Sequence, residues 1–490
     1  MIPEGLVVLT SMAKILAALR LSKKAVLTQN LLALENLARV DTICLDKTGT
    51  ITSGNLQVKE VYWINKKYVY AFKRHVNQDK TPNATQLACQ KYFGYDKEKV
   101  DDYLAFSSKR KYSASKIGED IFLMGSSETL HIDAIPVAMD TLQKQGYRIV
   151  VLAKAKGMLT KPFDIQAVAY VVLQDELNSS IKETLNYLQK EKVDIRIISG
   201  DNEKTVTAIA QKAGLLLRHK SANVNANIDY NLQIFGRVLP KQKKEIVAAL
   251  QKQGHIVAMV GDGVNDVAAL RQADVSISFA KAHGAAKNIA DIVLVDNDFK
   301  QVPLAIEEGR RIIHNISASA SLFFMKTIYS FIFSLGLICF HFTYPFMPIQ
   351  LTILSVFGVG IPSFLLQIEK HPEPIEKAFL KKAMLRSLPC ALHFIIGILF
   401  LQSWYLSKWI FIYAAGSYIM TLCFIYPPST WLRRIVISTM FLAYVIAIYF
   451  GHYYLQISLP QFDFSFFLFL VIITIGNYLY EKGIKRWQYK

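Results

Sequence analysis

The sequence predicts two parts, an α/β head built on a parallel sheet and an all-α bundle that crosses a membrane. Short apolar runs that end in polar, glycine-containing turns recur between residues 40 and 305, as buried parallel strands do. From residue 315 onward, long apolar runs dominate, each close to the ~20 residues that span a bilayer. The strand pattern weakens over residues 57–168, which indicates an inserted segment within the head.

The head is organised around Asp46, which follows the apolar run 40–45 and begins the string Asp-Lys-Thr-Gly-Thr-Ile-Thr. The carboxyl end of a parallel strand is where open α/β sheets place their ligands. A carboxylate there can attack a phosphoryl group and become an aspartyl-phosphate. Lys47 and the hydroxyls of Thr48 and Thr50 suit the incoming phosphate and a Mg2+ ion.

A second strand end carries a companion site. Residues 256–260 form an apolar run that ends in Gly-Asp-Gly-Val-Asn-Asp. Its carboxylate and amide oxygens suit a hard cation, so we expect Asp262 to bind Mg2+ beside Asp46, with support from Asn265 and Asp266. The sequence contains no Gly-x-x-x-x-Gly-Lys-Ser/Thr string, which argues against a P-loop nucleotide site.

The two strings resemble the phosphorylation and hinge motifs of the P-type ATPases, ion pumps that cycle through an aspartyl-phosphate. The resemblance implies an α/β haloacid-dehalogenase-like phosphorylation domain with an inserted α+β nucleotide-binding domain, plus an all-α transmembrane bundle. The implied division is 1–38 for the cytosolic half of the fourth membrane helix and its stalk, 39–56 and 169–305 for the two parts of the phosphorylation domain, 57–168 for the nucleotide-binding domain, and 306–490 for a six-helix transmembrane region.

The resemblance extends to further catalytic residues. Ser199 and Gly200 follow the apolar run 195–198 and stand where the family holds a phosphoryl oxygen, with Ser in place of the usual Thr. In residues 235–243, which resemble another family segment, Lys243 is the lysine that steadies the phosphate. The implied catalytic residues are Asp46, Lys243, Ser199, Gly200 and Asp201, and the implied magnesium ligands are Asp46, Thr48 and Asp262.

The inserted segment resembles the family's nucleotide-binding domain. Phe106 would stack on adenine, and Lys111 and Arg148 would neutralise phosphates. The chain departs from the family at Met124, where a lysine is usual, and at Asn178, where an arginine is usual. The implied ligand is ATP, and the implied binding residues are Phe106, Lys111, Arg148, Asp175, Arg237 and Asn265.

Six membrane spans are expected, at 315–340, 347–368, 386–404, 407–427, 433–452 and 464–481. Lysines and arginines gather in alternate loops, so the positive-inside rule predicts both ends of this region in the cytosol. We therefore expect a multi-pass protein of the cell membrane with a cytosolic catalytic head and the lipid bilayer as a partner. This distribution also accounts for the net charge of +18, so no nucleic-acid partner is expected.

Two ionisable residues lie in apolar surroundings, Glu4 and Lys326. Residues 2–6 resemble the unwound midpoint of the fourth helix of calcium-type pumps, where Pro and Gly free backbone carbonyls and aim a carboxylate at a cation. We expect Lys326 to face Glu4 as a fixed counter-charge, with snorkelling toward the cytosol as the alternative. Ser330 and Val359 stand where calcium pumps have Glu and Asp, so Glu4 is nearly the only acid left in this part.

The expected function is ATP-driven cation transport through an aspartyl-phosphate, with Ca2+ as the favoured cation. The sequence contains no Thr-Gly-Glu triplet, the family's motif for hydrolysing the phosphoenzyme. We therefore expect only the rear part of a pump, without the actuator domain and first membrane helices. Two alternatives stay open. One is a transport-incompetent remnant or split subunit that binds ATP and autophosphorylates, with a separate chain supplying the actuator domain. The other is a polyamine or lipid translocase.

Overall fold

A computed structural model describes residues 4–79, 81–107, 110–132, 136–224, 228–340, 343–369, 379–403, 406–455 and 457. The chain divides into two compact units. The head comprises Lys24–Asn36 and Val40–Leu304, and the helical unit comprises Met1–Lys23, Leu37–Arg39 and Ala305–Lys490.

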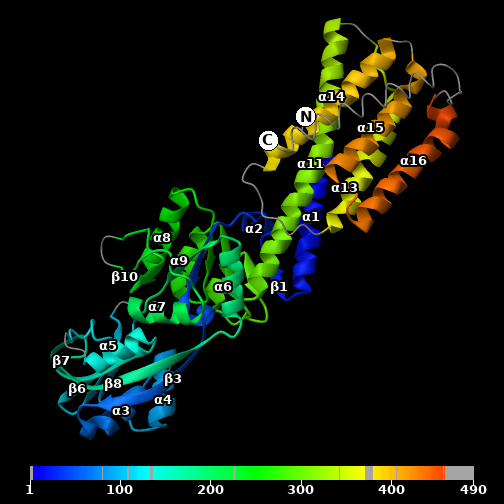
Figure 1. Ribbon diagram of the computed structural model, residues 1–490. Helices are drawn as coiled ribbons and strands as arrows, with labels where there is room; N and C mark the ends of the chain where they lie inside the picture. The colour runs from blue at the N-terminus through cyan, green and yellow to red at the C-terminus, as the bar shows by residue number, and fades with distance from the viewer. Residues whose placement is uncertain are drawn as a thin grey trace. The chain divides into compact units, whose positions relative to one another are not determined.

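The head is built on an eight-stranded sheet in the order β1-β14-β13-β12-β2-β9-β11-β10. Strand β2 (Thr42–Asp46) lies inside the sheet, between β12 (Val257–Val260) and β9 (Asp194–Ile198), and is parallel to both (Figure 1). These strands are buried along nearly their whole length, as the uninterrupted apolar runs predict. The remaining strands are β1 (Val26–Thr28), β10 (Ser221–Asn223), β11 (Ile234–Gly236), β13 (Val275–Phe279) and β14 (Ile292–Leu294).

Helices pack on this sheet through their apolar stripes. On one face, Ile246, Val247 and Leu250 of α8 (Pro240–Lys252) contact the strands together with residues of α9 (Val267–Gln272) and α10 (Gly284–Ile289). The head also contains α2 (Leu31–Leu37), α6 (Ile181–Lys190) and α7 (Glu203–Lys212), the last of which begins directly after the string Ser199-Gly200-Asp201.

The inserted domain is a second sheet, antiparallel and six-stranded, in the order β3-β8-β7-β6-β5-β4. Helices α3 (Val69–Val76) and α4 (Ala84–Phe93) pack on one of its faces, and α5 (Val137–Lys144) on the other. The predicted boundaries at 57 and 168 fall inside strands, because the second sheet already pairs at Thr52 and Leu177. The strands are β3 (Thr52–Trp63), β4 (Asp102–Leu104), β5 (Tyr112–Ile117), β6 (Asp120–Gly125), β7 (Arg148–Met158) and β8 (Lys161–Leu177).

In the described part of the chain, 6 helical segments are long and apolar enough to cross a membrane. Five of them correspond to the first five predicted spans. The sixth predicted span, 464–481, lies outside the described residues, and the sixth helix is instead α1 (Glu4–Ser22). The other segments are α11 (Gln301–Phe340), the interrupted helix 348–368, α14 (Phe379–Ser403), residues 407–425 including α15 (Ile410–Ile425), and α16 (Trp431–Leu455).

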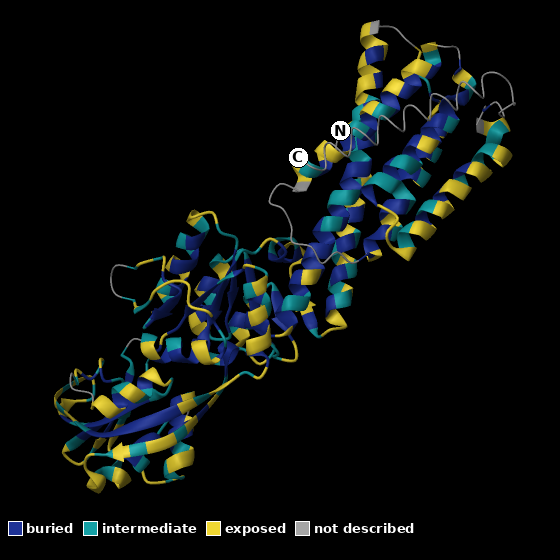
Figure 2. Ribbon diagram, in the orientation of Figure 1, coloured by how far each residue is buried: buried dark blue, intermediate teal, exposed yellow. Residues whose placement is uncertain are grey.

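The helical unit keeps its aromatic core inside and exposes apolar side chains outside. Its core contains Tyr329, Phe394 and Tyr418, each essentially without exposed surface. By contrast, α16 exposes a long stripe that includes Phe441 and Tyr453 (Figure 2). Large exposed apolar stripes are unfavourable in water and favourable against lipid, so this unit is built for a bilayer.

The second membrane segment is interrupted in its middle. Between α12 (Pro348–Ser355) and α13 (Ile361–Leu365), residues Val356–Gly360 form a wider, π-helical turn. The Tyr444 hydroxyl donates to the Leu354 carbonyl at 2.9 Å, next to this turn. Such turns inside helices are frequent at functional sites.

Candidate active site

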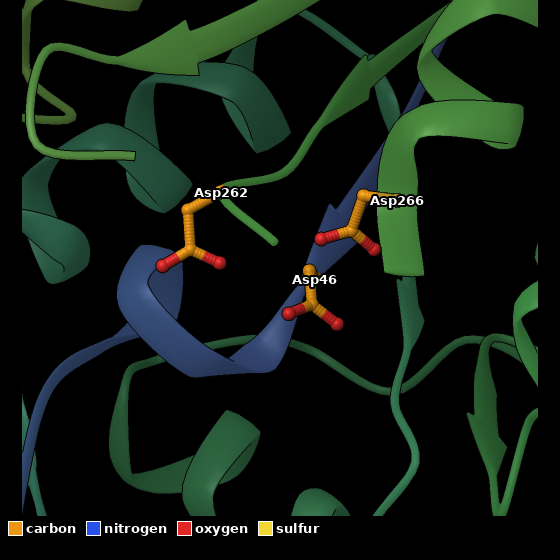
Figure 3. Close-up of side chains that lie close together, drawn as sticks. All are labelled: Asp46, Asp262 and Asp266. Carbon is orange, nitrogen blue, oxygen red and sulfur yellow. The ribbon is translucent and has the colours of Figure 1, made fainter. Parts of the chain in front are cut away.

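Three carboxylates from neighbouring strand ends meet at the carboxyl edge of the main sheet. Asp46 ends β2, while Asp262 and Asp266 follow the adjacent strand β12. One oxygen from each lies within 4.8 Å of the others. Figure 3 shows the three side chains gathered around one point. The parallel pairing of β2 and β12 therefore brings together two strings that are more than two hundred residues apart in the sequence.

Lys243 supplies the counter-charge of this cluster. Its ammonium lies 2.6 Å from an Asp46 oxygen and 2.6 Å from an Asp266 oxygen. The lysine is buried at the start of α8, so burial opposes its charge, but the two carboxylates outweigh that effect and raise its pKa. Burial raises the pKa of Asp46 to about 7, with Lys243 acting against the rise and the neighbouring carboxylates adding to it.

The cluster fits a magnesium ion. Its donors are all oxygens, the ligands that Mg2+ prefers. Burial, helped by Asp266, raises the pKa of Asp262 to about 6, so the site concentrates negative charge that a divalent cation would stabilise. Asp46, Asp262 and the nearby Thr48 would hold the ion. Asp266, to which the sequence assigned only a supporting role, contributes an oxygen to the same cluster.

Gly49 makes room for this cluster. Its φ of 72° lies in the left-handed region, which favours glycine. A Cβ built at this position would lie only 1.8 Å from an Asp262 oxygen. The glycine therefore allows the loop after Asp46 to approach the Asp262 carboxylate.

A cavity of about 420 Å3 opens above the carboxylates and is lined by both sheets of the head. Apolar side chains from the second sheet, Met124 and Val150, form part of its wall, as suits a nucleotide base. Most of the residues predicted from the sequence line it, namely Asp46, Thr48, Phe106, Lys111, Arg148, Ser199, Gly200, Asp201, Arg237, Lys243, Asp262 and Asn265.

The structure places Asp175 differently from the prediction. Asp175 does not line the cavity, and its carboxylate accepts a hydrogen bond from the buried Lys47 ammonium at 2.7 Å. Lys47 also lies 2.8 Å from Asp201. A fully buried ammonium needs such counter-charges, and Asp175 supplies one. The role of Asp175 in nucleotide binding stays a prediction.

Asp201 connects this buried pair to the cavity. Its carboxylate lies 3.5 Å from the Arg148 guanidinium and also contacts Lys47. Burial disfavours its charge, but Arg148, Lys47 and Arg237 together hold the pKa of Asp201 well below its usual range. Asp201 is therefore an ionised residue that orients Arg148 at the cavity wall.

Arg237 has a partner that the sequence did not suggest. Its guanidinium donates to the Glu128 carboxylate at 2.6 Å. Glu128 follows β6 in the string Met-Gly-Ser-Ser-Glu. The two residues are 109 positions apart in the chain, so no local pattern connects them.

Comparisons with known proteins agree with this geometry. Residues 40–274 match the haloacid dehalogenase-like hydrolase family. A relative from Streptococcus pneumoniae, named "Probable cation-transporting ATPase exp7", is 40% identical, and the match covers 82% of this chain and 55% of that protein. "Calcium-transporting ATPase CtpE" of Mycolicibacterium smegmatis is 32% identical over 91% of this chain and 61% of its own length.

A third relative, from Mycoplasma pneumoniae, is named "Probable cation-transporting P-type ATPase" and is 27% identical over 76% of this chain and 49% of its own length. The chain belongs to the P-type ATPases. It spans about half to three fifths of the length of these relatives. As a P-type ATPase whose described residues include six apolar helical segments, it is a multi-pass membrane protein with a soluble catalytic head.

The two membrane residues of this P-type ATPase are less fully described. Lys326 lies half-buried in α11, within the first predicted span. The Glu4 side chain lies outside the described residues, although its backbone begins α1. The pairing of Lys326 with Glu4 therefore stays a prediction.

Proposed function

We propose that this chain carries the phosphorylation step of an ATP-driven cation pump, in which Asp46 receives the γ-phosphoryl group of ATP. The observation that carries the proposal is the position of Asp46 on the cavity floor, 2.6 Å from Lys243 and within the carboxylate cluster. Lys243 favours the ionised form of Asp46 that a nucleophile needs, against the burial that raises its pKa.

Each residue of the cavity floor has a separate proposed role in the transfer of the phosphoryl group. An oxygen of Asp46 attacks the γ-phosphorus, the bond between that phosphorus and the bridging oxygen breaks, and ADP leaves with the bond electrons. Ser199 and Gly200 provide a hydroxyl and a backbone amide for the phosphoryl oxygens, and Lys243 offsets their charge. Bound Mg2+ supplies further charge neutralisation.

Nucleotide binding is assigned to the cavity wall. Phe106 offers an aromatic face to the base, and it is 39% exposed, so its ring is free to be covered by a ligand. Lys111, Arg148 and Arg237 carry the positive charge that the phosphates require. Because Met124 is neutral, the base end of the cavity is apolar and the phosphate end is cationic.

The cargo proposed for the membrane part is a cation, with Ca2+ favoured by the name of the relative from Mycolicibacterium smegmatis. Glu4 and Lys326 are the proposed transport residues within the helical unit. The alternatives are a split subunit that binds ATP and autophosphorylates while a separate chain supplies the actuator domain, and a polyamine or lipid translocase.

Replacement of the nucleophile tests the central step. The purified protein with [γ-32P]ATP and Mg2+ should form an acid-stable label that hydroxylamine removes, and Asp46→Asn should abolish it. Asp164→Asn, on an exposed hairpin of the second sheet, removes a carboxylate elsewhere and should keep the label. A label that persists in Asp46→Asn would show that the phosphoryl group is carried elsewhere.

A further inference from the structure

One carboxylate ties the inserted domain to the edge of the main sheet. Glu128 accepts a hydrogen bond from the Arg237 guanidinium at 2.6 Å through one oxygen, and from the Asn202 amide at 3.0 Å through the other. Arg237 follows β11, and Asn202 caps the N-terminus of α7. Both oxygens of Glu128 are therefore engaged by groups from the main sheet.

Both of these donors line the cavity. Arg237 presents its guanidinium where the phosphate chain of a nucleotide is expected, close to Lys111. Burial disfavours the charge of Glu128, but Arg237 and Asn202 hold its pKa at about 2, so the residue is an anion at neutral pH. A guanidinium donates the same N–H groups to a carboxylate or to a phosphate, so a phosphate and Glu128 compete for the Arg237 nitrogen that contacts Glu128.

We propose that Glu128 is a positioning residue that competes with the nucleotide phosphates for Arg237. The Glu128 carboxylate occupies Arg237 in the structure described here, and a bound polyphosphate displaces it. The competition weakens nucleotide binding by the free energy needed to break the Glu128–Arg237 contact. This inference rests on the proposed binding of ATP in the cavity.

Other contacts hold the two sheets together when Arg237 changes its partner. Lys204 of α7 lies 2.5 Å from Asp140 of α5, and the Thr205 hydroxyl donates to the Tyr147 carbonyl at 3.2 Å. Neither contact uses a cation of the cavity. The Lys204–Asp140 pair is thus a matched control, an ion pair between the same two parts of the head that does not involve the nucleotide.

The test measures the dissociation constant of β,γ-methylene ATP for the full chain in detergent, by isothermal titration calorimetry. Glu128→Gln keeps the size of the side chain and removes its charge, and it should bind the analogue about five- to tenfold more tightly, since hydrogen bonds to charged groups are strong. Asp140→Asn leaves the Glu128–Arg237 contact in place, and Glu128→Asp keeps the negative charge at position 128. Both variants should have dissociation constants within about twofold of that of the unmodified protein. Unchanged or weaker binding by Glu128→Gln would overturn the proposal.

A double-mutant cycle separates competition from a structural role. In an Arg237→Gln background, Glu128→Gln should change the dissociation constant by less than about twofold, because the contested guanidinium is gone. A structural role of Glu128 would give the same change in both backgrounds and would contradict the proposal. If the unmodified chain does not bind the analogue, the proposed nucleotide site is wrong. If the unmodified chain and Glu128→Gln bind the analogue equally well, only the proposed competition is wrong.

Discussion

The geometry of the candidate site depends on the absence of a side chain at Gly49 as well as on the charges of its carboxylates. Gly49 and Gly54 both have left-handed backbones, with φ of 72° and 77°. A Cβ at Gly49 would collide with the Asp262 carboxylate, whereas a Cβ at Gly54 would meet no atom within 4 Å. The pair therefore separates backbone strain, which both substitutions share, from displacement of a proposed magnesium ligand, which only one causes.

We predict that Gly49→Ala lowers the initial rate of phosphorylation from ATP by about a hundredfold or more, since small misplacements of reacting groups have effects of that size. Gly54→Ala should cost about 1–2 kcal/mol of stability through strain but keep most of the rate. The measurement is 32P incorporation at saturating Mg2+. Labelling of Gly49→Ala at the normal rate would show that the Asp262 carboxylate is not needed where the structure places it.

Most of the predicted site residues line the cavity. Asp46, Thr48, Asp262 and Asn265 were predicted because they follow buried strands, whereas the others were predicted from the family resemblance. The sequence did not identify the partners. Lys47 was assigned to the phosphate, yet its ammonium is held by Asp175 and Asp201. Glu128 was not assigned at all. Pairings of this kind depend on how two sheets pack, and no sequence spacing encodes that.

Among the elements, the interrupted membrane helix has a position, Gly358, where the packing leaves no room for a larger side chain. A Cβ at Gly358 would lie 2.3 Å from the Tyr418 ring and 2.8 Å from the Tyr444 hydroxyl. Tyr418 is held in turn by the Tyr329 hydroxyl at 2.8 Å. Since these aromatic side chains are buried and closely packed, the ring of Tyr418 has little freedom to move away.

Gly358→Ala should therefore overpack the helical unit and lower its stability by about 1–3 kcal/mol. Gly416→Ala, in α15, is the control, because a Cβ there meets nothing within 4 Å and alanine favours helix. Thermal unfolding in detergent, followed by tryptophan fluorescence, should show a lower midpoint for the first variant and no decrease for the second. Equal midpoints would mean that the π-helical turn relaxes without cost.

Element boundaries were predicted well where burial is complete and poorly where it is partial. The apolar run 256–260 became β12, which begins one residue later, because both faces of that strand are covered. Strands β3 and β8 alternate between exposed and half-buried residues over much of their length, so the inserted domain had no clear edge in the sequence. The first five residues of α11 were assigned to the head, because the predicted boundary at 306 falls inside this helix.

At the scale of the whole molecule, the proposed roles of the head and of the helical unit are tested by different experiments. All residues proposed for the phosphorylation step lie in the head, so the 32P label tests the head and not the cargo. The cargo depends on the helical unit, where Glu4 and Lys326 are the proposed residues. The fold class followed from hydropathy and two motifs, but the cargo did not, because several cations share the same oxygen ligands.

In reconstituted vesicles, we predict that Ca2+ stimulates ATP hydrolysis more than Mn2+, K+ or a polyamine, at constant Mg2+. Lys326→Ala should change the cation dependence while leaving the dissociation constant for the nucleotide unchanged, since Lys326 lies within the membrane segment of α11. Stimulation by polyamine alone would favour the translocase alternative. Phosphorylation without stimulation by any of these cargoes would favour the split subunit.

The chain enters and leaves the inserted domain through two adjacent strands, and this has a mechanical consequence. β3 leaves directly after the loop of Asp46, β8 returns beside it, and the Asn178 amide donates to the Ile51 carbonyl at 2.9 Å where the two meet. A twist of this ribbon would turn the inserted domain once contacts such as Lys204–Asp140 opened. The pivot lies within a few residues of Asp46, so a slight rotation there would displace the far end of the inserted domain by much more.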